Sequence, residues 1–228
     1  MYDRAGVRCT FIGHPLVGSL TRRLKQGAPV KKGKQKIVGL LPGSRKSEIV
    51  RLLDPMLQSA RLIKKHKHVR FLLPNVNAQM SDYIAGRLRE YPDLQVEYSW
   101  QNSLNVMQAS DLLLVASGTA TLEAAVLDAP MIILYRVSWL NFLLAGLVVR
   151  TKFIGMVNLL ARRQVAPEFL QTEVDPEVVS QVALGMLEKR VTAYEDVLKQ
   201  LGRGNPAEKA ARAILELLQL SAARGRKA

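Results

Sequence analysis

The chain has 228 residues, enough for one large domain or two small ones with a sizeable hydrophobic core. Its net charge of +14 favours anionic partners: phosphorylated substrates, acidic lipid surfaces or nucleic acid. The single cysteine, Cys9, excludes an internal disulfide and a multi-cysteine metal site, and it fits a reducing compartment. The charged first ten residues argue against a signal peptide, and no run of about 18 apolar residues predicts a membrane span.

Residues 1–35 are predicted to form an inter-domain segment and a basic linker. Cys9–Ile12 is short, apolar and strand-like, and Gly13-His14-Pro15 follows it. Residues 21–36 are rich in Lys and Arg with interspersed Gly and Pro, so we expect a solvated loop there. A surface patch for acidic lipid head groups is the functional alternative. Nucleic acid is disfavoured because no aromatic residue interleaves with these charges.

From residue 36 onward, short apolar runs alternate with helical patterns. The apolar runs predict strands at 37–41, 69–73, 94–98, 111–116 and 131–135. The patterns between them predict helices at 49–63, 78–91, 103–109 and 119–127. This alternation indicates an α/β fold: a Rossmann-like parallel sheet over residues 36–175, with helices on both faces. Residues 176–228 are predicted to be C-terminal helices, broken only at Gly202–Pro206, and a basic tail.

The first strand leads into Leu40-Leu41-Pro42-Gly43-Ser44-Arg45-Lys46-Ser47-Glu48-Ile49, which predicts a strand end, a tight turn and a helix start. A turn at a helix N-terminus presents backbone N–H groups and the positive end of the helix dipole, so it can hold a phosphate. Arg45 can add a bidentate cationic fork to the same anion. An ordinary turn with a surface arginine fits this decapeptide about equally well.

A second turn of this kind, Ser117-Gly118-Thr119-Ala120-Thr121-Leu122-Glu123, follows the fourth strand. Gly118 lets a ligand approach the backbone, the hydroxyl side chains can contact a phosphate, and Glu123 can accept hydrogen bonds from a ribose diol. A purely stabilising helix cap is the alternative. Two such turns at strand ends of one sheet favour a nucleotide site. Neither matches a Walker loop or a Gly-x-Gly-x-x-Gly fingerprint, which disfavours ATP hydrolysis and dinucleotide redox chemistry.

The ordered set of motifs resembles lipid-A-disaccharide synthase. The resemblance rests on Leu41–Arg45 with Glu48, Ala116–Glu123, Tyr135-Arg136, Asn158–Ala161 and Pro167–Gln171, and Gly13-His14-Pro15 resembles that family's crossing into its second domain. It implies the C-terminal, nucleotide-binding half of a two-domain GT-B fold. It also implies an inverting glycosyltransferase that transfers 2,3-diacylglucosamine from UDP to lipid X, giving lipid A disaccharide 1-phosphate and UDP.

The same resemblance assigns roles to individual residues. Arg45 is the catalytic candidate, because it would bind the diphosphate and offset charge on the leaving group. The implied UDP-donor site consists of Gly43, Ser44, Arg45, Ser117, Gly118, Thr119, Glu123, Asn158 and Gln171. Asn158 would face the donor, whereas Gln171 fits a surface position at a helix end about as well. No metal or other cofactor is implied, since positive groups and helix dipoles take the place of a cation.

Only the C-terminal half of the family's length is represented, so we expect the chain to need the missing N-terminal half, in cis or in trans. That half supplies the acceptor contacts and the candidate base in the family. The alternative is a non-catalytic UDP-sugar-binding or membrane-docking module. The hypothesis of an RNA-binding domain rests on net charge alone, so nucleic acid is not expected as a partner. The resemblance also suggests a homodimer with exchanged C-terminal segments, residues 176–220.

The most apolar stretch, Trp139–Val149, has basic residues on both sides. A buried core helix is one interpretation. The favoured one is an interfacial helix that presents Trp139, Phe142 and Leu143 to lipid while Arg136, Arg150 and Lys152 meet anionic head groups. Because both implied substrates are acylated, we expect a cytoplasmic protein peripheral to the anionic inner-membrane surface.

Overall fold

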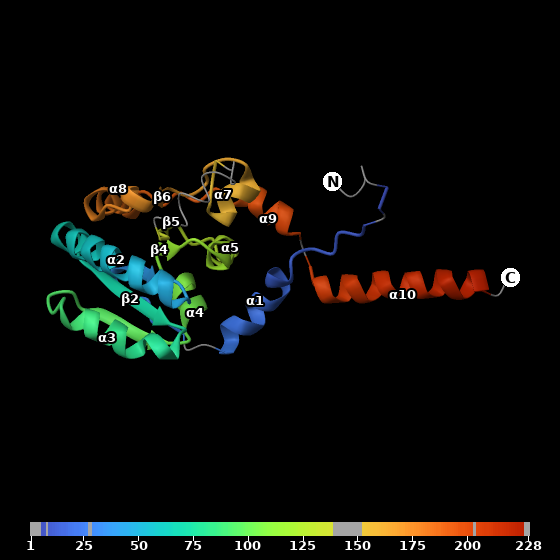
Figure 1. Ribbon diagram of the computed structural model, residues 1–228, viewed down its shortest axis with the longest axis horizontal. Helices are drawn as coiled ribbons and strands as arrows, with labels where there is room; N and C mark the ends of the chain where they lie inside the picture. The colour runs from blue at the N-terminus through green and yellow to red at the C-terminus, as the bar shows by residue number, and fades with distance from the viewer. Residues whose placement is uncertain (1–5, 8, 27–28, 139–151, 203, 226–228) are drawn as a thin grey trace.

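The computed structural model describes residues 6–7, 9–26, 29–138, 152–202 and 204–225. Its centre is a six-stranded sheet in the order β3-β2-β1-β4-β5-β6, and every neighbouring pair is parallel. The strands are β1 Lys36–Leu41, β2 Val69–Asn75, β3 Val96–Trp100, β4 Leu112–Ala116, β5 Met131–Tyr135 and β6 Glu168–Leu170. Helices cover both faces of the sheet (Figure 1), which confirms the predicted Rossmann-like α/β class.

The helices divide into two layers, each with its own hydrophobic core. One layer contains α2 Lys46–His66, η2 Ala78–Met80, α3 Ser81–Arg89 and α8 Pro176–Glu188. The other contains α1 Pro15–Gln26, α4 Ser103–Ala109, α5 Thr119–Val126, α7 Met156–Ala161 and α9 Glu195–Leu201. The remaining elements are η3 Gln171–Glu173, which follows β6, and α10 Pro206–Gly225.

The central strands are apolar along their whole length because both of their faces are buried. In β4, Leu112 and Leu114 join the core under α2, whereas Leu113 and Val115 join the core under α5. Side chains alternate between the two faces of a strand, so neither face of β4 leaves room for polar residues. The apolar stripe of α2, formed by Ile49, Leu52, Leu53 and Met56, completes the first core.

The order of the strands places a crevice between β1 and β4. The chain moves outward from β1 to β2 and β3, then returns to place β4 on the other side of β1. The helices that follow β1 and β4 therefore lie on opposite faces of the sheet, and the turns that precede them diverge. A parallel sheet of this kind binds ligands at the carboxyl ends of its strands where the order reverses.

The N-terminal region differs from the sequence expectations. Residues 21–26, predicted as a loop, belong to the helix α1 Pro15–Gln26. The helix extends this far because Leu16, Leu20 and Leu24, spaced four positions apart, pack into the core that α1 shares with α4 and α5. The strand predicted at Cys9–Ile12 is absent, since this segment has no sheet partner and the Phe11 side chain is exposed.

The C-terminal third also departs from the expected continuous helix. Residues 189–194 separate α8 from α9 and are not helical. β6 was not predicted, because three residues are too few for a periodic signal. α8 packs on α2 within the same chain and buries Val179, Ala183 and Leu187. The homodimer with exchanged C-terminal segments stays a prediction, which light scattering on the purified chain would test.

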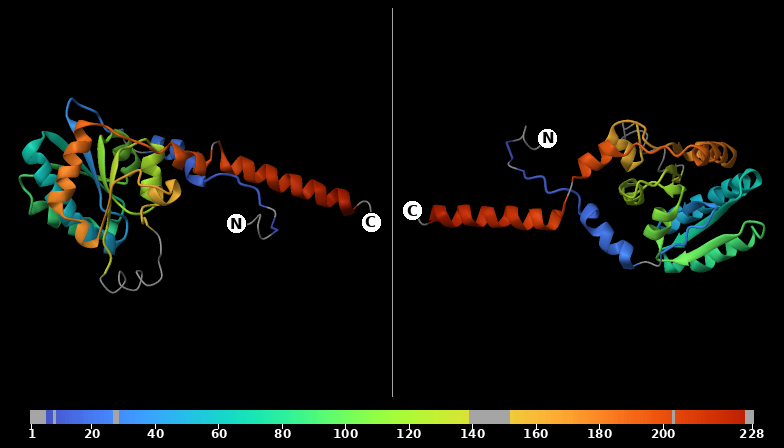
Figure 2. Two further views of the ribbon diagram at one scale, coloured as in Figure 1. Left: turned by 90° about the horizontal axis from the view of Figure 1, so that it is seen from above. Right: turned by 180° about the vertical axis from the view of Figure 1, so that it is seen from behind.

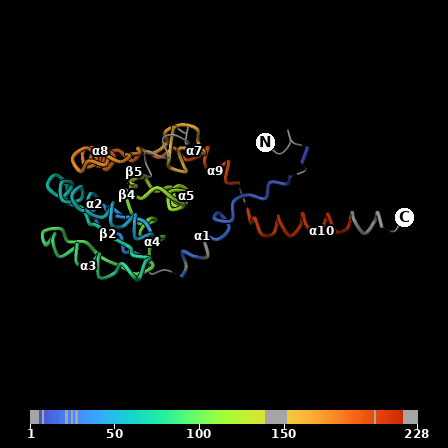
Figure 3. Tube along the Cα trace, in the orientation of Figure 1, coloured from blue at the N-terminus to red at the C-terminus, as the bar shows by residue number. Residues whose placement is uncertain are grey.

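α10 projects away from the sheet as a long separate rod (Figures 1 and 2). The tube in Figure 3 follows the chain from α9 across a short connection into α10, beside the start of α1. The C-terminal end of α9 is held by the backbone N–H of His14, which donates to the Leu201 carbonyl at 2.7 Å. Several apolar side chains of α10 are exposed, including Ile214, Leu217 and Leu218. Within the described residues, no helix is long and apolar enough to cross a bilayer.

Candidate functional site

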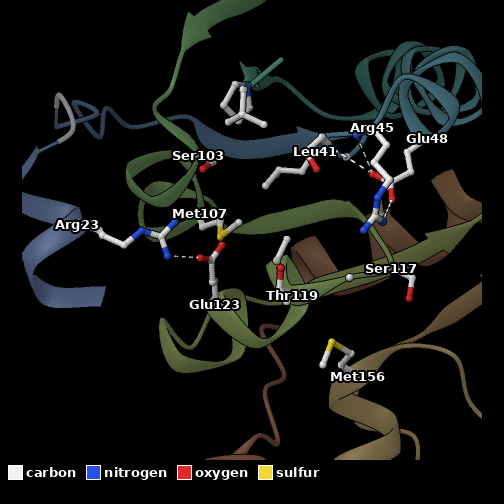
Figure 4. A pocket seen from close by; sticks show the side chains of 17 residues that line it. Arg23, Leu41, Arg45, Glu48, Ser103, Met107, Ser117, Thr119, Glu123 and Met156 are labelled. Carbon is white, nitrogen blue, oxygen red and sulfur yellow. Dashed lines mark hydrogen bonds and ion pairs between the residues drawn. The ribbon is translucent and has the colours of Figure 1, made fainter. Parts of the chain in front are cut away.

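A cavity of about 500 Å³ opens where the sequence predicts the nucleotide site, beyond the carboxyl ends of β1 and β4. Its walls come from α1, the two turns, α4, α5 and the start of α7 (Figure 4). The predicted residues of the turns, Gly43, Ser44, Arg45, Ser117, Gly118, Thr119 and Glu123, all line it. Tertiary structure therefore brings together two motifs that are more than 70 residues apart in the chain.

The first turn is closed by Gly43 and Glu48. Gly43 has φ +107°, a conformation that favours glycine, and a Cβ there would collide with the Glu48 side chain. The Glu48 Oε2 atom accepts hydrogen bonds from the backbone N–H groups of Ser44 at 3.0 Å and Arg45 at 3.2 Å. This arrangement is a helix cap in which the Glu48 carboxylate takes the place that the sequence suggests for a phosphate.

The Arg45 side chain is therefore the charged part of this turn that can reach a ligand. Its guanidinium Nη1 pairs with Glu48 Oε1 at 2.7 Å, yet 78% of the side chain is exposed. Figure 4 shows the Arg45 and Glu48 side chains facing each other at one end of the cavity. A guanidinium has five N–H donors, so one bond to Glu48 leaves further donors for an anion.

The second turn leaves open space for a ligand. A Cβ added to Gly118 would meet no atom within 4 Å, and Thr119 is exposed at the cavity wall. The Ser117 hydroxyl donates to the Ile154 carbonyl at 3.3 Å, which ties this turn to the segment before α7. Thr121, by contrast, is buried and donates its hydroxyl to the Gly118 carbonyl at 2.7 Å. Thr121 therefore hydrogen-bonds back to Gly118, the residue before α5, and it does not line the cavity.

Glu123 lies at the other end of the cavity, away from Arg45. Its Oε1 atom forms an ion pair at 2.5 Å with the Arg23 guanidinium, which comes from α1 (Figure 4). The sequence gives no local signal for this pair, because its members are 100 residues apart and Arg23 lies in the region predicted as a linker. Only the packing of α1 against α5 brings the two residues together.

Asn158 lies outside the cavity and is fully buried. Its Nδ2 atom donates to the Ala166 carbonyl at 2.9 Å and to Glu168 Oε2 at 2.8 Å. Its Oδ1 atom accepts from the N–H groups of Val165 at 2.8 Å and Ala166 at 3.0 Å. All of the hydrogen-bonding capacity of this amide is used within the protein, so its predicted contact with the donor stays a prediction that needs a rearrangement.

Gln171 also lies outside this cavity, and its side chain holds the backbone of another segment. Its Oε1 atom accepts from the Val137 N–H at 2.7 Å and its Nε2 atom donates to the Val137 carbonyl at 3.2 Å. Arg136 donates to the Gln171 and Val174 carbonyls. These contacts anchor the chain just before residues 139–151, which contain Trp139, Phe142 and Leu143 and lie outside the described residues.

Comparison with known proteins identifies the family of the chain. The family model described as lipid-A-disaccharide synthetase matches residues 1–219. The chain belongs to this family. Lipid-A-disaccharide synthase of Colwellia psychrerythraea is 34% identical over 226 residues, which cover 95% of this chain and 58% of that protein. The enzyme of Syntrophus aciditrophicus is 33% identical over 232 residues, covering 97% of this chain and 61% of that protein. The chain thus spans about three-fifths of the length of these synthases.

Solved structures support the fold of this family member. A UDP-GlcNAc 2-epimerase of Methanocaldococcus jannaschii, solved with UDP-GlcNAc and UDP, has a TM-score of 0.58 and 14% identity. The likeness covers 94% of this chain and 57% of the epimerase. MurG of Acinetobacter baumannii has a TM-score of 0.51 and 13% identity, covering 90% of this chain and 55% of MurG. At such low identity, these likenesses show the fold alone.

Proposed function

We propose that this chain is the donor-binding half of a lipid-A-disaccharide synthase and binds UDP-2,3-diacylglucosamine in the cavity between β1 and β4. The observation that carries the proposal is the meeting of the two turns at one cavity in a chain of this family. The cavity has a cationic group at one end, Arg45, and a carboxylate at the other, Glu123. These ends suit a diphosphate and a ribose diol, respectively.

The proposed reaction is the transfer of 2,3-diacylglucosamine to lipid X. The bond from the sugar C1 to the UDP oxygen breaks, a bond from C1 to the acceptor hydroxyl oxygen forms, and the hydroxyl proton passes to a base. Arg45 offsets the negative charge that grows on the departing UDP, and the open turn at Gly118 and Thr119 receives the diphosphate. Glu123 holds the ribose.

The base and the acceptor contacts are proposed to come from the part of the relatives that this chain does not match, in cis or in trans. The relatives' aligned regions leave about two-fifths of their length outside this chain. The same observation keeps a second candidate open: a UDP-sugar-binding or membrane-docking module without transferase activity. Both candidates bind UDP, and only the first supports transfer.

Calorimetry and a transfer assay test the proposal. The purified chain is titrated with UDP, and binding that saturates at one site is expected. It is then incubated with UDP-2,3-diacylglucosamine and lipid X, with and without the N-terminal part of a relative. Disaccharide formation only when that part is present supports the donor-binding half. UDP binding without transfer in either mixture favours the non-catalytic module, and absence of UDP binding contradicts both.

We also propose that the apolar stretch Trp139–Val149 docks the protein on anionic membranes, since both proposed substrates are acylated. The native chain is expected to sediment with vesicles that contain anionic phospholipid at low salt, because apolar side chains and flanking cations act together. Replacing Trp139 and Phe142 together with serine is expected to reduce the bound fraction severalfold. Neutral vesicles serve as the control, and unchanged sedimentation of the double variant would rule out docking through this stretch.

A further inference from the structure

The ion pair between Arg23 and Glu123 is the contact by which α1 reaches the cavity. Arg23 Nη1 lies 2.5 Å from Glu123 Oε1, and both residues line the cavity wall. The Glu123 side chain is only 12% exposed, whereas the Arg23 side chain is 45% exposed. Figure 4 shows Arg23 extending from α1 toward Glu123, well apart from the pair formed by Arg45 and Glu48.

A carboxylate as little exposed as that of Glu123 has lost much of its contact with water, and a hydrogen-bonded ion pair offsets part of that loss. The Arg23 guanidinium donates a hydrogen bond to one oxygen of this carboxylate, Oε1. Within the described part of the chain, the other oxygen, Oε2, has no hydrogen-bond partner. The pair therefore fixes the orientation of the carboxylate and leaves one oxygen able to accept from a ligand hydroxyl.

The position of Arg23 is itself fixed by its helix. α1 buries Leu16 and Leu20 in the same core as Leu122, which neighbours Glu123. The N-terminal end of α1 is anchored where the His14 N–H donates to the Leu201 carbonyl. A side chain that extends from such an anchored helix holds its partner more firmly than one on a loop.

We propose that Arg23 is a positioning residue that orients Glu123 toward the ribose and so makes the site prefer ribonucleotides to 2′-deoxyribonucleotides. The proposal rests on the proposed function of the cavity as a UDP-sugar site. Arg23 acts through Glu123 and does not contact the diphosphate, which lies at the Arg45 end of the cavity. Loss of Arg23 should thus remove the advantage that the 2′-hydroxyl gives to UDP.

Calorimetric titrations with UDP and 2′-deoxy-UDP test this role in the full chain. The native chain is expected to bind UDP about tenfold more tightly than 2′-deoxy-UDP, the size of one hydrogen bond to a charged group. Arg23→Ala is expected to weaken UDP binding by about tenfold and to change 2′-deoxy-UDP binding less than about twofold. Arg23→Lys, which retains a cation, is expected to keep most of the preference.

Glu123→Gln and the double variant separate positioning from direct contact. If Arg23 acts through Glu123, then adding Arg23→Ala to Glu123→Gln causes no further loss of UDP affinity. Arg163→Ala is the control, because the Arg163 side chain is about as exposed as that of Arg23, forms an ion pair with Asp196 at 3.0 Å and does not line the cavity. This control is expected to bind both nucleotides as the native chain does.

Three outcomes would overturn the proposal. Equal losses for UDP and 2′-deoxy-UDP in Arg23→Ala would mean that Arg23 acts on the phosphates or on folding. A further loss of UDP affinity when Arg23→Ala is added to Glu123→Gln would mean that it contacts the nucleotide directly. Absence of UDP binding to the native chain would contradict the proposed function of the cavity, and this inference with it.

Discussion

Replacing Arg45 with alanine is expected to weaken UDP binding by about tenfold to a hundredfold, which is about 1.5–3 kcal/mol for hydrogen bonds between a charged donor and an anion. The Arg45 side chain is 78% exposed, so its removal leaves no cavity. Glu48 still accepts from the backbone N–H groups of Ser44 and of residue 45, so the cap of α2 remains. Calorimetry with UDP and thermal unfolding, measured on the same sample, check both parts of this expectation.

Two variants serve as controls for Arg45→Ala. Arg61→Ala removes another exposed ion pair of α2, with Asp93, at a site outside the cavity, and it should leave UDP affinity unchanged. Arg45→Lys retains the charge and loses the bidentate fork, so an intermediate affinity is expected. Native UDP affinity in Arg45→Ala would show that the first turn does not bind the diphosphate.

Replacing Asn158 with alanine is expected to lower the free energy of unfolding by about 3 kcal/mol, because several buried polar groups lose their partner at once. These groups are the N–H groups of Val165 and Ala166, the Ala166 carbonyl and the Glu168 carboxylate. Glu168 also accepts from the Gly155 N–H, so the loss extends to the segment beside Ser117. Urea denaturation of the native chain and the variant measures the change.

Asn158→Asp tests how much the Nδ2 donor of Asn158, as distinct from its Oδ1 acceptor, contributes to the free energy of unfolding. The aspartate keeps the acceptor for Val165 and Ala166, but it places an oxygen opposite the Glu168 carboxylate and the Ala166 carbonyl. We therefore expect it to be destabilising as well. If Asn158→Ala instead keeps native stability and loses UDP affinity, then Asn158 contacts the UDP-sugar donor, as the family resemblance implies. The buried hydrogen bonds of Asn158 would then contribute little to stability.

Sequence alone was sufficient for five of the six strands and for the two turns. Strands buried on both faces are apolar throughout, and the helices between them show a periodic apolar stripe, so each element carries its own signal. Both turns consist of adjacent residues, and their place at strand ends follows from the alternation of strands and helices. Local signals of this kind fail for α1 and β6. α1 lies in a basic stretch that is typical of a loop, and β6 is three residues long.

The amino-acid sequence by itself determined the fold class, the family and the residues of the turns that line the cavity. The tertiary structure decided which polar side chains in and around the cavity form hydrogen bonds or ion pairs within the protein. Glu48 occupies the N–H groups of the first turn, Arg23 pairs with Glu123 across 100 residues, and Asn158 is enclosed by the segment before β6. The physical reason is that capping and periodicity depend on near neighbours in the chain. A buried carboxylate or amide takes its partner from whichever segment packs against it, and the packing of the helices against the sheet selects that segment.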